Sequence, residues 1–154
     1  MTKITVSDVA ACILLRTGAV SAMKLQKLCY YAQAWSLVWD EAPLYPEVIE
    51  AWVGGPVCPA LYAVHKGRYT VAGIPGGKPD VLTTDQRETV EAVLKGYGHL
   101  TAQQLSTLTH SEDPWKNARR GLPATARGHA EITIDAMQEF YSSLVDREDA
   151  EVVA

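Results

Sequence analysis

The sequence has few of the residues from which disulfide frameworks and metal sites are built. Its 154 residues include only three cysteines, Cys12, Cys29 and Cys58, and no CxxC pair. This odd number of cysteines, set among apolar neighbours, indicates buried thiols in a reducing compartment. The four histidines, at positions 65, 99, 110 and 129, show neither HxxxH nor HExxH spacing. We therefore expect no metal site and no cofactor.

Clustered positive charge and long apolar runs are also missing. Fourteen Lys and Arg residues against eighteen Asp and Glu residues leave a net charge of -4. This balance argues against nucleic-acid binding, which depends on Lys and Arg side chains that face phosphates. No apolar run approaches the roughly 20 residues that a membrane span needs, and the N-terminus lacks the pattern of a signal peptide. We expect a cytoplasmic protein that contacts neither nucleic acid nor membrane.

The most informative segment that is present runs from Ser21 to Trp39. From Leu28 onward, only Gln33 and Ser36 interrupt its apolar and aromatic positions. A surface helix would need a wider polar face than this. Ser21 suits an N-cap, and no Pro or Gly interrupts the run. The segment therefore predicts a central, buried helix.

Capping and breaker residues predict the other helices. Thr83 with Gln86, and Thr101 with Gln104, have the spacing of capping boxes, and Asp113 suits the N-cap of a short helix. Pro56 suits the first turn of a helix that follows a Gly-Gly break. The predicted helices cover residues 7–17, 56–67, 84–97, 102–109, 114–120 and 134–145.

The remaining segments predict little strand and one domain. Residues 48–53 alternate enough for a short strand. The Gly- and Pro-rich residues 69–82 favour either the tip of a β-hairpin or a mobile loop. We expect a mainly α, compact, single-domain helical fold with a central buried helix and room for a short two-stranded hairpin. This domain covers residues 1–145, and residues 146–154 form an acidic tail that we expect to be frayed.

Two lysines, Lys24 and Lys27, occupy the first turns of the central helix, where the helix dipole favours acidic residues. In one interpretation each side chain reaches solvent or pairs with a carboxylate such as Glu50. In the other, both contact an acidic surface of a partner, since local inconsistencies of this kind are common at functional sites.

The catalytic candidates are His65, His110 and Cys58, the last near a helix N-terminus where a thiol pKa can fall. Cys58 and His65 are seven residues apart on one predicted helix, or roughly 10 Å, which is beyond hydrogen-bond reach. We expect Glu112 to be solvated. The carboxylates available for acid–base chemistry are Glu50, Glu112 and Asp113.

Aromatic residues are the stronger indication of function. Four Trp and seven Tyr accompany a single Phe, and Trp and Tyr suit half-exposed grooves and protein interfaces. We expect Trp35 and Trp39 to pack in the centre of the fold, and Trp52, Tyr62 and Trp115 to compete for an interface role. The candidates for partner binding are Lys24, Lys27, Trp52, Tyr62, His65, His110, Trp115 and Lys116.

Three segments in a fixed order form a family signature. They are KLQKLCYYAQAW (24–35), EAWVGGPVCPALY (50–62) with His65 beyond it, and LTHSEDPWKNAR (108–119). This order and spacing resembles the Panacea domain family, the SocA-like antitoxins that also include phage-associated GepA proteins. The resemblance implies a small helical domain that binds and neutralises a toxin and is not an enzyme.

The resemblance also implies partners. These are a cognate protein toxin encoded by a neighbouring gene and, as in part of the family, a AAA+ protease to which the toxin is delivered. The rival hypothesis is a small intracellular hydrolase or transferase that uses His65, His110 and Glu50 or Cys58 in a Trp-lined cleft. A neighbouring gene for a small toxic protein favours the first hypothesis, and an isolated gene in a metabolic operon favours the second.

Overall fold

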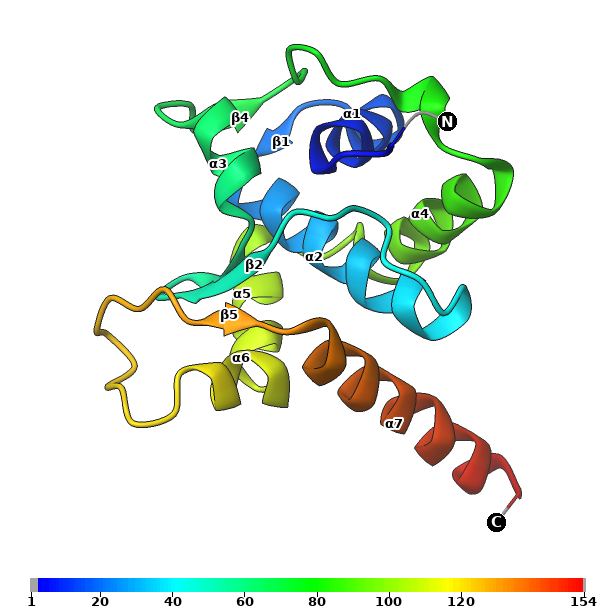
Figure 1. Cartoon of the computed structure of the whole chain (residues 1–154), viewed down its shortest axis with the longest axis vertical. Coiled ribbons are helices and arrows are strands. Elements are labelled where there is room, and N and C mark those ends of the chain that lie inside the picture. The colour runs from blue at the N-terminus through cyan, green and yellow to red at the C-terminus, as the bar shows by residue number, and fades with distance from the viewer. Residues whose placement is uncertain (1–2, 154) are drawn as a thin grey trace.

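Helix α2 crosses the middle of the molecule, and the other helices surround it (Figure 1). This computed structural model describes the backbone of residues 3–153 and the side chains of residues 3–146. The helices are α1 (Val6–Thr17), α2 (Ala22–Trp39), α3 (Pro59–His65), the 3-10 helix η1 (Pro79–Val81), α4 (Thr84–Tyr97), α5 (Ala102–His110), α6 (Asp113–Ala118) and α7 (Ile134–Val153). The strands are β1 (Val20–Ser21), β2 (Ile49–Trp52), β3 (Gly55–Val57), β4 (Thr70–Val71) and β5 (Glu131–Ile132).

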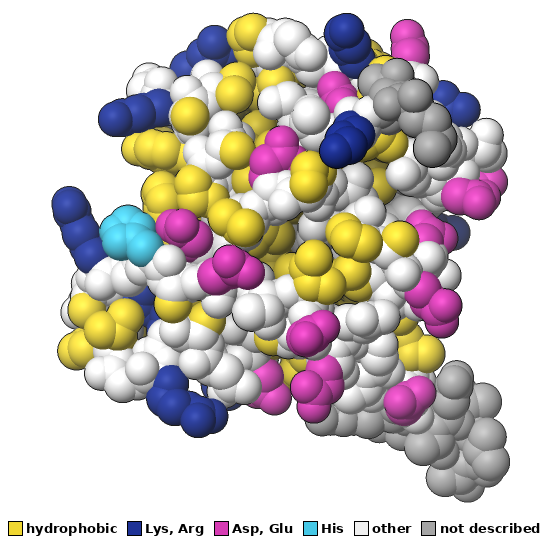
Figure 2. Space-filling model, viewed as in Figure 1, with side chains coloured by type: hydrophobic (Ala, Val, Ile, Leu, Met, Phe, Trp, Pro, Cys, Tyr) yellow, Lys and Arg dark blue, Asp and Glu magenta, His cyan; other side chains and the backbone are white. Residues whose placement is uncertain are grey.

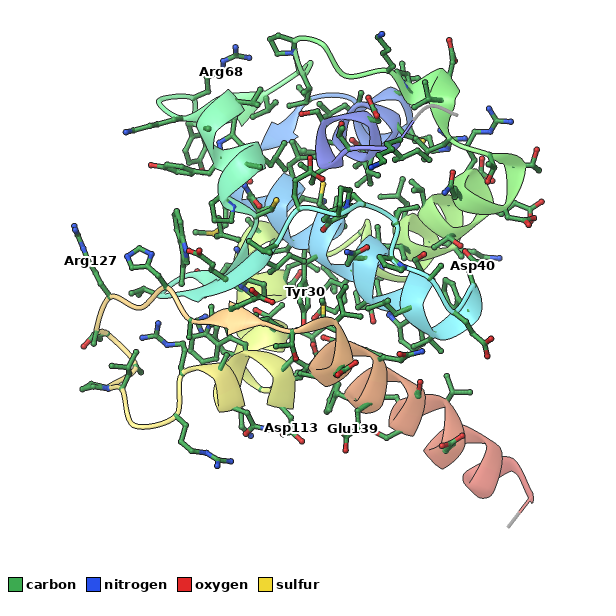
Figure 3. The ribbon with its side chains drawn as sticks, in the orientation of Figure 1. Tyr30, Asp40, Arg68, Asp113, Arg127 and Glu139 are labelled. Atoms are coloured by element: carbon green, nitrogen blue, oxygen red, sulfur yellow. The ribbon has the colours of Figure 1, made fainter. Side chains whose placement is uncertain are left out.

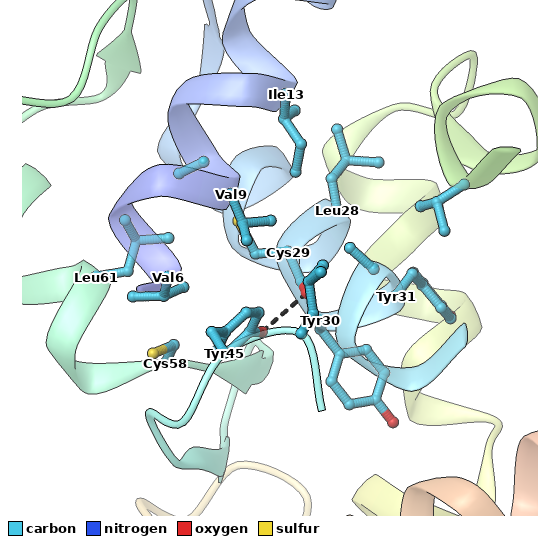
Figure 4. Close-up of a cluster of buried hydrophobic side chains, with 14 of the residues drawn as sticks. Val6, Val9, Ile13, Leu28, Cys29, Tyr30, Tyr31, Tyr45, Cys58 and Leu61 are labelled. Atoms are coloured by element: carbon cyan, nitrogen blue, oxygen red, sulfur yellow. Dashed lines mark hydrogen bonds between the residues drawn. The ribbon is translucent and has the colours of Figure 1, made fainter. Parts of the chain in front are cut away.

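The prediction of a mainly α fold around a buried helix is confirmed. Helix α2 contacts α1, α4, α5 and α7, and every residue from Leu25 to Ala34 is buried. Figure 4 shows the cluster in which side chains of α1 pack against α2 and the Tyr45 hydroxyl donates to the Cys29 carbonyl at 2.8 Å. Burial on all sides explains why the segment is apolar nearly all the way round.

Trp35 and Trp39 were expected to pack in the centre of the fold, and this prediction is wrong for Trp39. Trp35 is half-buried and donates its indole N–H to the Tyr97 hydroxyl at 2.9 Å. Trp39 is 47% exposed and stacks on Trp35 with ring centroids 5.0 Å apart. The helix emerges at the surface at its end, so Trp39 does not pack in the centre.

Gln33 and Ser36, the polar residues within the apolar run of α2, bind the loop that follows the helix. The Gln33 side chain accepts from the backbone N–H of Leu44 at 2.6 Å and of Tyr45 at 3.3 Å, and donates to the Tyr45 carbonyl at 2.8 Å. Ser36 donates to the Ala42 carbonyl at 2.7 Å. The Gln33 bonds satisfy backbone groups of Leu44 and Tyr45 that burial would otherwise leave without partners.

Strand β2 lies within the predicted strand at residues 48–53, but its hairpin with β3 was not predicted; β5 pairs with the other edge of β2. The prediction that Pro56 begins a helix is wrong, because Pro56 lies in β3 opposite Ala51. Proline is tolerated in an edge strand, which needs fewer backbone donors. Helix α3 begins instead at Pro59, with Cys58 at its N-cap.

The Gly- and Pro-rich segment 69–82 does not close a hairpin on itself. Val71 of β4 pairs with Val20 of β1, which is distant in sequence. Further along, the Asp8 carboxylate accepts from the backbone N–H of Lys78 at 2.8 Å. The segment is therefore tied to β1, which follows α1, and to the first turn of α1.

The capping boxes of α4 and α5 are confirmed, with both reciprocal bonds present. A third box, Thr5 with Asp8, starts α1 one residue before the predicted position. Helix α7 continues to Val153, beyond the predicted end at residue 145. The side chains of the acidic tail from residue 147 onward lie outside the described residues, so the proposed boundary between domain and tail stays a prediction.

The expectations for Glu112 and Asp113 are wrong. Glu112 holds the N-cap position of α6 without a side-chain cap bond, and Asp113 is the first helical residue. The Glu112 carboxylate is buried and accepts from the hydroxyls of Tyr31 at 2.7 Å and Tyr141 at 2.9 Å. Burial raises its pKa above the ordinary value, and the two tyrosine hydrogen bonds oppose that rise. Helices α2 and α7 bring these hydroxyls together, which no local pattern predicts.

Candidate functional site

A pocket of about 520 Å³ opens beside the first turns of α2. Its walls come from α2, the β2–β3 hairpin, α3 and the loop after α3. This volume is within the range of pockets that hold a small ligand. The lining residues are Ala22, Met23, Gln26, Lys27, Trp52, Gly54, Val57, Tyr62, His65, Lys66, Gly67, Arg68 and Tyr69.

Gln26 fixes the inner wall of the pocket. Its side-chain oxygen accepts from the Cys58 N–H at 2.9 Å, and its Nε2 atom contacts the Cys58 carbonyl at 3.3 Å and the His65 Nε2 atom at 2.9 Å. Burial lowers the pKa of His65, so a neutral ring accepts from the Gln26 amide. Sequence analysis did not single out Gln26, although a polar residue between Leu25 and Leu28 on a buried helix is a visible signal.

Trp52 and Tyr62 form a ridge at the mouth of the pocket. Their rings meet edge to face with centroids 5.1 Å apart, and the Trp52 indole donates to Glu50 at 2.8 Å. On the other side of the ridge lies a second hollow of about 380 Å³, which Arg127 and His129 help to line. The two hollows therefore share these two aromatic residues.

His110 and Trp115 line neither hollow. They lie against the β2–β3 hairpin, outside both hollows. Trp115 is buried and donates its indole N–H to the Trp52 carbonyl at 2.8 Å, while His110 stacks on it with centroids 4.0 Å apart. Burial, followed by the charges of Lys27 and Arg119, lowers the pKa of His110. Of the five polar and aromatic candidates, Trp52, Tyr62 and His65 share the pocket.

Two of the three candidate lysines lie elsewhere. Lys24 donates to the Gly98 carbonyl at 2.7 Å and lines a separate hollow. Lys116 is exposed, 3.9 Å from Asp113. Both side chains have local structural partners.

Lys27 is different, because it lines the pocket and yet is only 1% exposed. Among the described residues it makes neither an ion pair nor a hydrogen bond, and Glu50, the carboxylate suggested as its partner, lies 3.5 Å from His129 instead. Neither the solvent-exposed nor the carboxylate-paired interpretation therefore describes Lys27. Burial lowers its pKa to about 8.

Gly55 makes room for this lysine. A Cβ atom at position 55 would stand 2.6 Å from Cε of Lys27, and the backbone φ of +123° is itself unfavourable for any residue with a Cβ. The Gly-Gly break in the second family segment thus serves the Lys27 side chain as well as the hairpin turn.

We predict that Lys27→Met raises the free energy of unfolding at pH 7 by about 3 kcal/mol, which is the cost of the shift from 10.5 to about 8. The unfolded chain binds more protons between these two pH values, so wild-type stability rises with pH there. The gain from Lys27→Met should shrink over the same range. Urea unfolding at pH 7 and pH 10 measures both effects, and a variant less stable than the wild type at pH 7 would contradict the prediction.

The catalytic candidates do not converge. Among the described residues no hydrogen bond joins the Cys58 thiol to His65 or His110, and burial raises rather than lowers the pKa of Cys58. Glu50 binds Trp52 and His129. Within the described part of the chain there is no group of His, Cys, Asp and Glu residues able to hold a metal ion, and no helix is long and apolar enough to span a membrane.

Comparison with known proteins places the pocket within a family region. The model of the family described as "Antitoxin SocA-like, Panacea domain" matches residues 25–116. The chain is also similar to antitoxin SocA of Caulobacter vibrioides (strain NA1000 / CB15N), with 32% identity over 124 residues, or 71% of this chain. The matched region spans 64% of the length of that relative. No solved structure matches the chain.

Proposed function

The chain belongs to the SocA-like Panacea domain family, and we propose on that premise that it is the antitoxin of a toxin–antitoxin pair. It neutralises a protein toxin by binding it directly. The toxin is the product of a neighbouring gene.

The observation that carries this proposal is where the family match lies in the fold. Residues 25–116 contain most of α2, the β2–β3 hairpin and α3, which wall the pocket, and α5, which supports it. The family region therefore includes most of the pocket lining, together with η1 and α4, which lie outside the pocket. A partly apolar hollow with aromatic walls is typical of a surface that receives a partner.

We extend the proposal to proteolysis. After binding, the chain hands the toxin to a AAA+ protease, in the way that the family resemblance implies. This step needs two surfaces, one for the toxin and one for the protease. It is therefore separable from neutralisation by simple occlusion.

The test is co-expression of this chain with the product of the adjacent reading frame. We expect the adjacent gene alone to stop growth, co-expression to restore growth, and the two proteins to co-purify. Under the protease extension, the half-life of the toxin should shorten when this chain is present and recover when the protease gene is deleted. A harmless neighbour, or rescue without a detectable complex, would overturn direct binding.

A His110→Gln variant separates binding from catalysis. Glutamine keeps hydrogen-bonding capacity but cannot act as a general base, so binding and rescue should both persist. Circular dichroism confirms that the variant is folded. A folded variant that still binds the toxin but no longer rescues growth would favour the hydrolase or transferase hypothesis instead.

A further inference from the structure

An unpaired charge lies at the bottom of the pocket. Lys27 is 1% exposed and lines the cavity, and no hydrogen bond or ion pair joins it to another residue of the described chain; its Nζ atom is not among the fully enclosed polar atoms without a partner, so it keeps contact with the open pocket. Such a charge is costly in the free protein. A carboxylate that enters the pocket would compensate it in a desolvated setting, where charge pairs couple strongly.

The rim of the pocket has the same sign of charge. Lys66 and Arg68 lie on the exposed loop after α3, and Arg127 lines the second hollow. Arg68 and Arg127 point outward along one edge of the molecule (Figure 3). Among the described residues that line the two hollows there is no Asp or Glu, although the whole chain has a net charge of -4.

Apolar groups surround these cations. Met23 is 45% exposed and Tyr69 is 85% exposed, and both line the pocket together with the Trp52–Tyr62 ridge. In Figure 2 hydrophobic side chains lie between projecting Lys and Arg side chains at the left edge, with Asp and Glu side chains beside the histidine there and others spread over the top, the right and the lower part. The surface complements a segment that is both acidic and apolar.

The second hollow favours a protein segment over a small molecule as the occupant. The two hollows adjoin across Trp52 and Tyr62, so a ligand confined to the larger one would leave the Arg127 side uncovered. An extended or helical segment can cover both. The cations on both sides of the ridge would then face one acidic partner.

We infer that the pocket receives an Asp or Glu side chain, flanked by apolar residues, from the partner protein, and that Lys27 is its counter-charge. This inference rests on the proposed function, because the partner is the toxin. It also assigns a chemistry to the toxin surface. The Lys27-binding segment should combine a carboxylate with neighbouring Leu, Ile or aromatic side chains.

The test compares Lys27→Met with Lys24→Met, which removes a lysine one turn earlier on α2 and outside the pocket. We expect Lys27→Met to weaken toxin binding about thirtyfold or more in calorimetry or biolayer interferometry. Lys24→Met should change it less than about threefold. Thermal melts must show both variants folded.

A double-mutant cycle identifies the partner group. Each Asp and Glu of the toxin is changed to Asn or Gln, and one substitution should weaken binding to the wild type but not to Lys27→Met. An exposed second variant, Arg68→Glu, should slow association and reduce its dependence on salt. Unchanged affinity for a folded Lys27→Met protein, or the absence of any toxin carboxylate coupled to position 27, overturns the inference.

A separate experiment with synthetic peptides tests whether the pocket binds acidic segments, even if the adjacent gene product does not bind this chain. The wild-type chain is applied to synthetic peptides in which Asp or Glu stands beside Leu or Phe, and to matched peptides with Asn or Gln. Binding to the acidic set alone, lost in Lys27→Met, supports the pocket although the proposed toxin is wrong. Binding to neither set, together with no toxin binding, overturns the inference along with the proposed function.

Discussion

The Leu28→Ala variant is expected to lose about 2–5 kcal/mol of unfolding free energy, a large part of the roughly 5–15 kcal/mol that holds a domain of this size. Leu28 is fully buried in the middle of α2 and belongs to the main hydrophobic core. Truncation removes apolar contacts and leaves a cavity that neighbouring helices fill only in part. Urea unfolding followed by circular dichroism measures the loss.

Leu15→Ala is the matched control, since Leu15 is also helical but 69% exposed. Its unfolding free energy should change by less than about 0.5 kcal/mol. Equal urea midpoints for Leu28→Ala and Leu15→Ala would show that α2 is not the centre of the core.

The Gln33→Met variant should lose about 3 kcal/mol, although methionine is similar in size and more apolar. Without the amide, the N–H groups of Leu44 and Tyr45 and the Tyr45 carbonyl lose their side-chain partner in the interior. Each buried polar group left unsatisfied costs about 1–3 kcal/mol, and local relaxation recovers part of the sum. Thermal or urea unfolding of the purified variant measures the effect.

Gln103→Met on α5 provides the comparison, because Gln103 is exposed and makes only a 3.4 Å contact with Thr107. Its stability should match that of the wild type to within about 0.5 kcal/mol. If Gln33→Met were as stable as Gln103→Met, the loop after α2 would not depend on this amide. Hydrogen exchange at Leu44 and Tyr45 would then be equally slow in both proteins.

The two predictions concern the element that also carries the pocket. Gln26 and Lys27 lie on α2 directly before Leu28 and about two turns before Gln33. A rigid, buried helix can hold a charged side chain at the base of a pocket because its backbone cannot move to release that charge. We therefore expect core variants such as Leu28→Ala to lose both stability and partner binding. Lys27→Met is the better probe of binding because it leaves the core intact.

Local patterns in the sequence were sufficient for α2, α4 and α5, although not for the start of α3, the cap of α6 or the end of α7. The apolar run of α2 and the capping boxes at Thr83 and Thr101 depend on residues within one or two turns of each other, and the structure confirms them. The buried state of the three cysteines followed equally from their apolar neighbours. The three family segments also lie within the sequence itself, and the family match to residues 25–116 confirms them.

Only the tertiary structure decided how the polar residues are used. Glu112 was expected in solvent, but α2 and α7 bring Tyr31 and Tyr141 to its carboxylate. Lys27 was expected either at the surface or in an ion pair, or in contact with an acidic partner; the hairpin closes over it at Gly55 and leaves it buried beside the pocket. A residue's hydrophobic neighbours in sequence determine whether its helix is buried. Which partner meets a charged side chain depends on contacts between segments that are far apart in the chain, and those contacts form only when the helices pack.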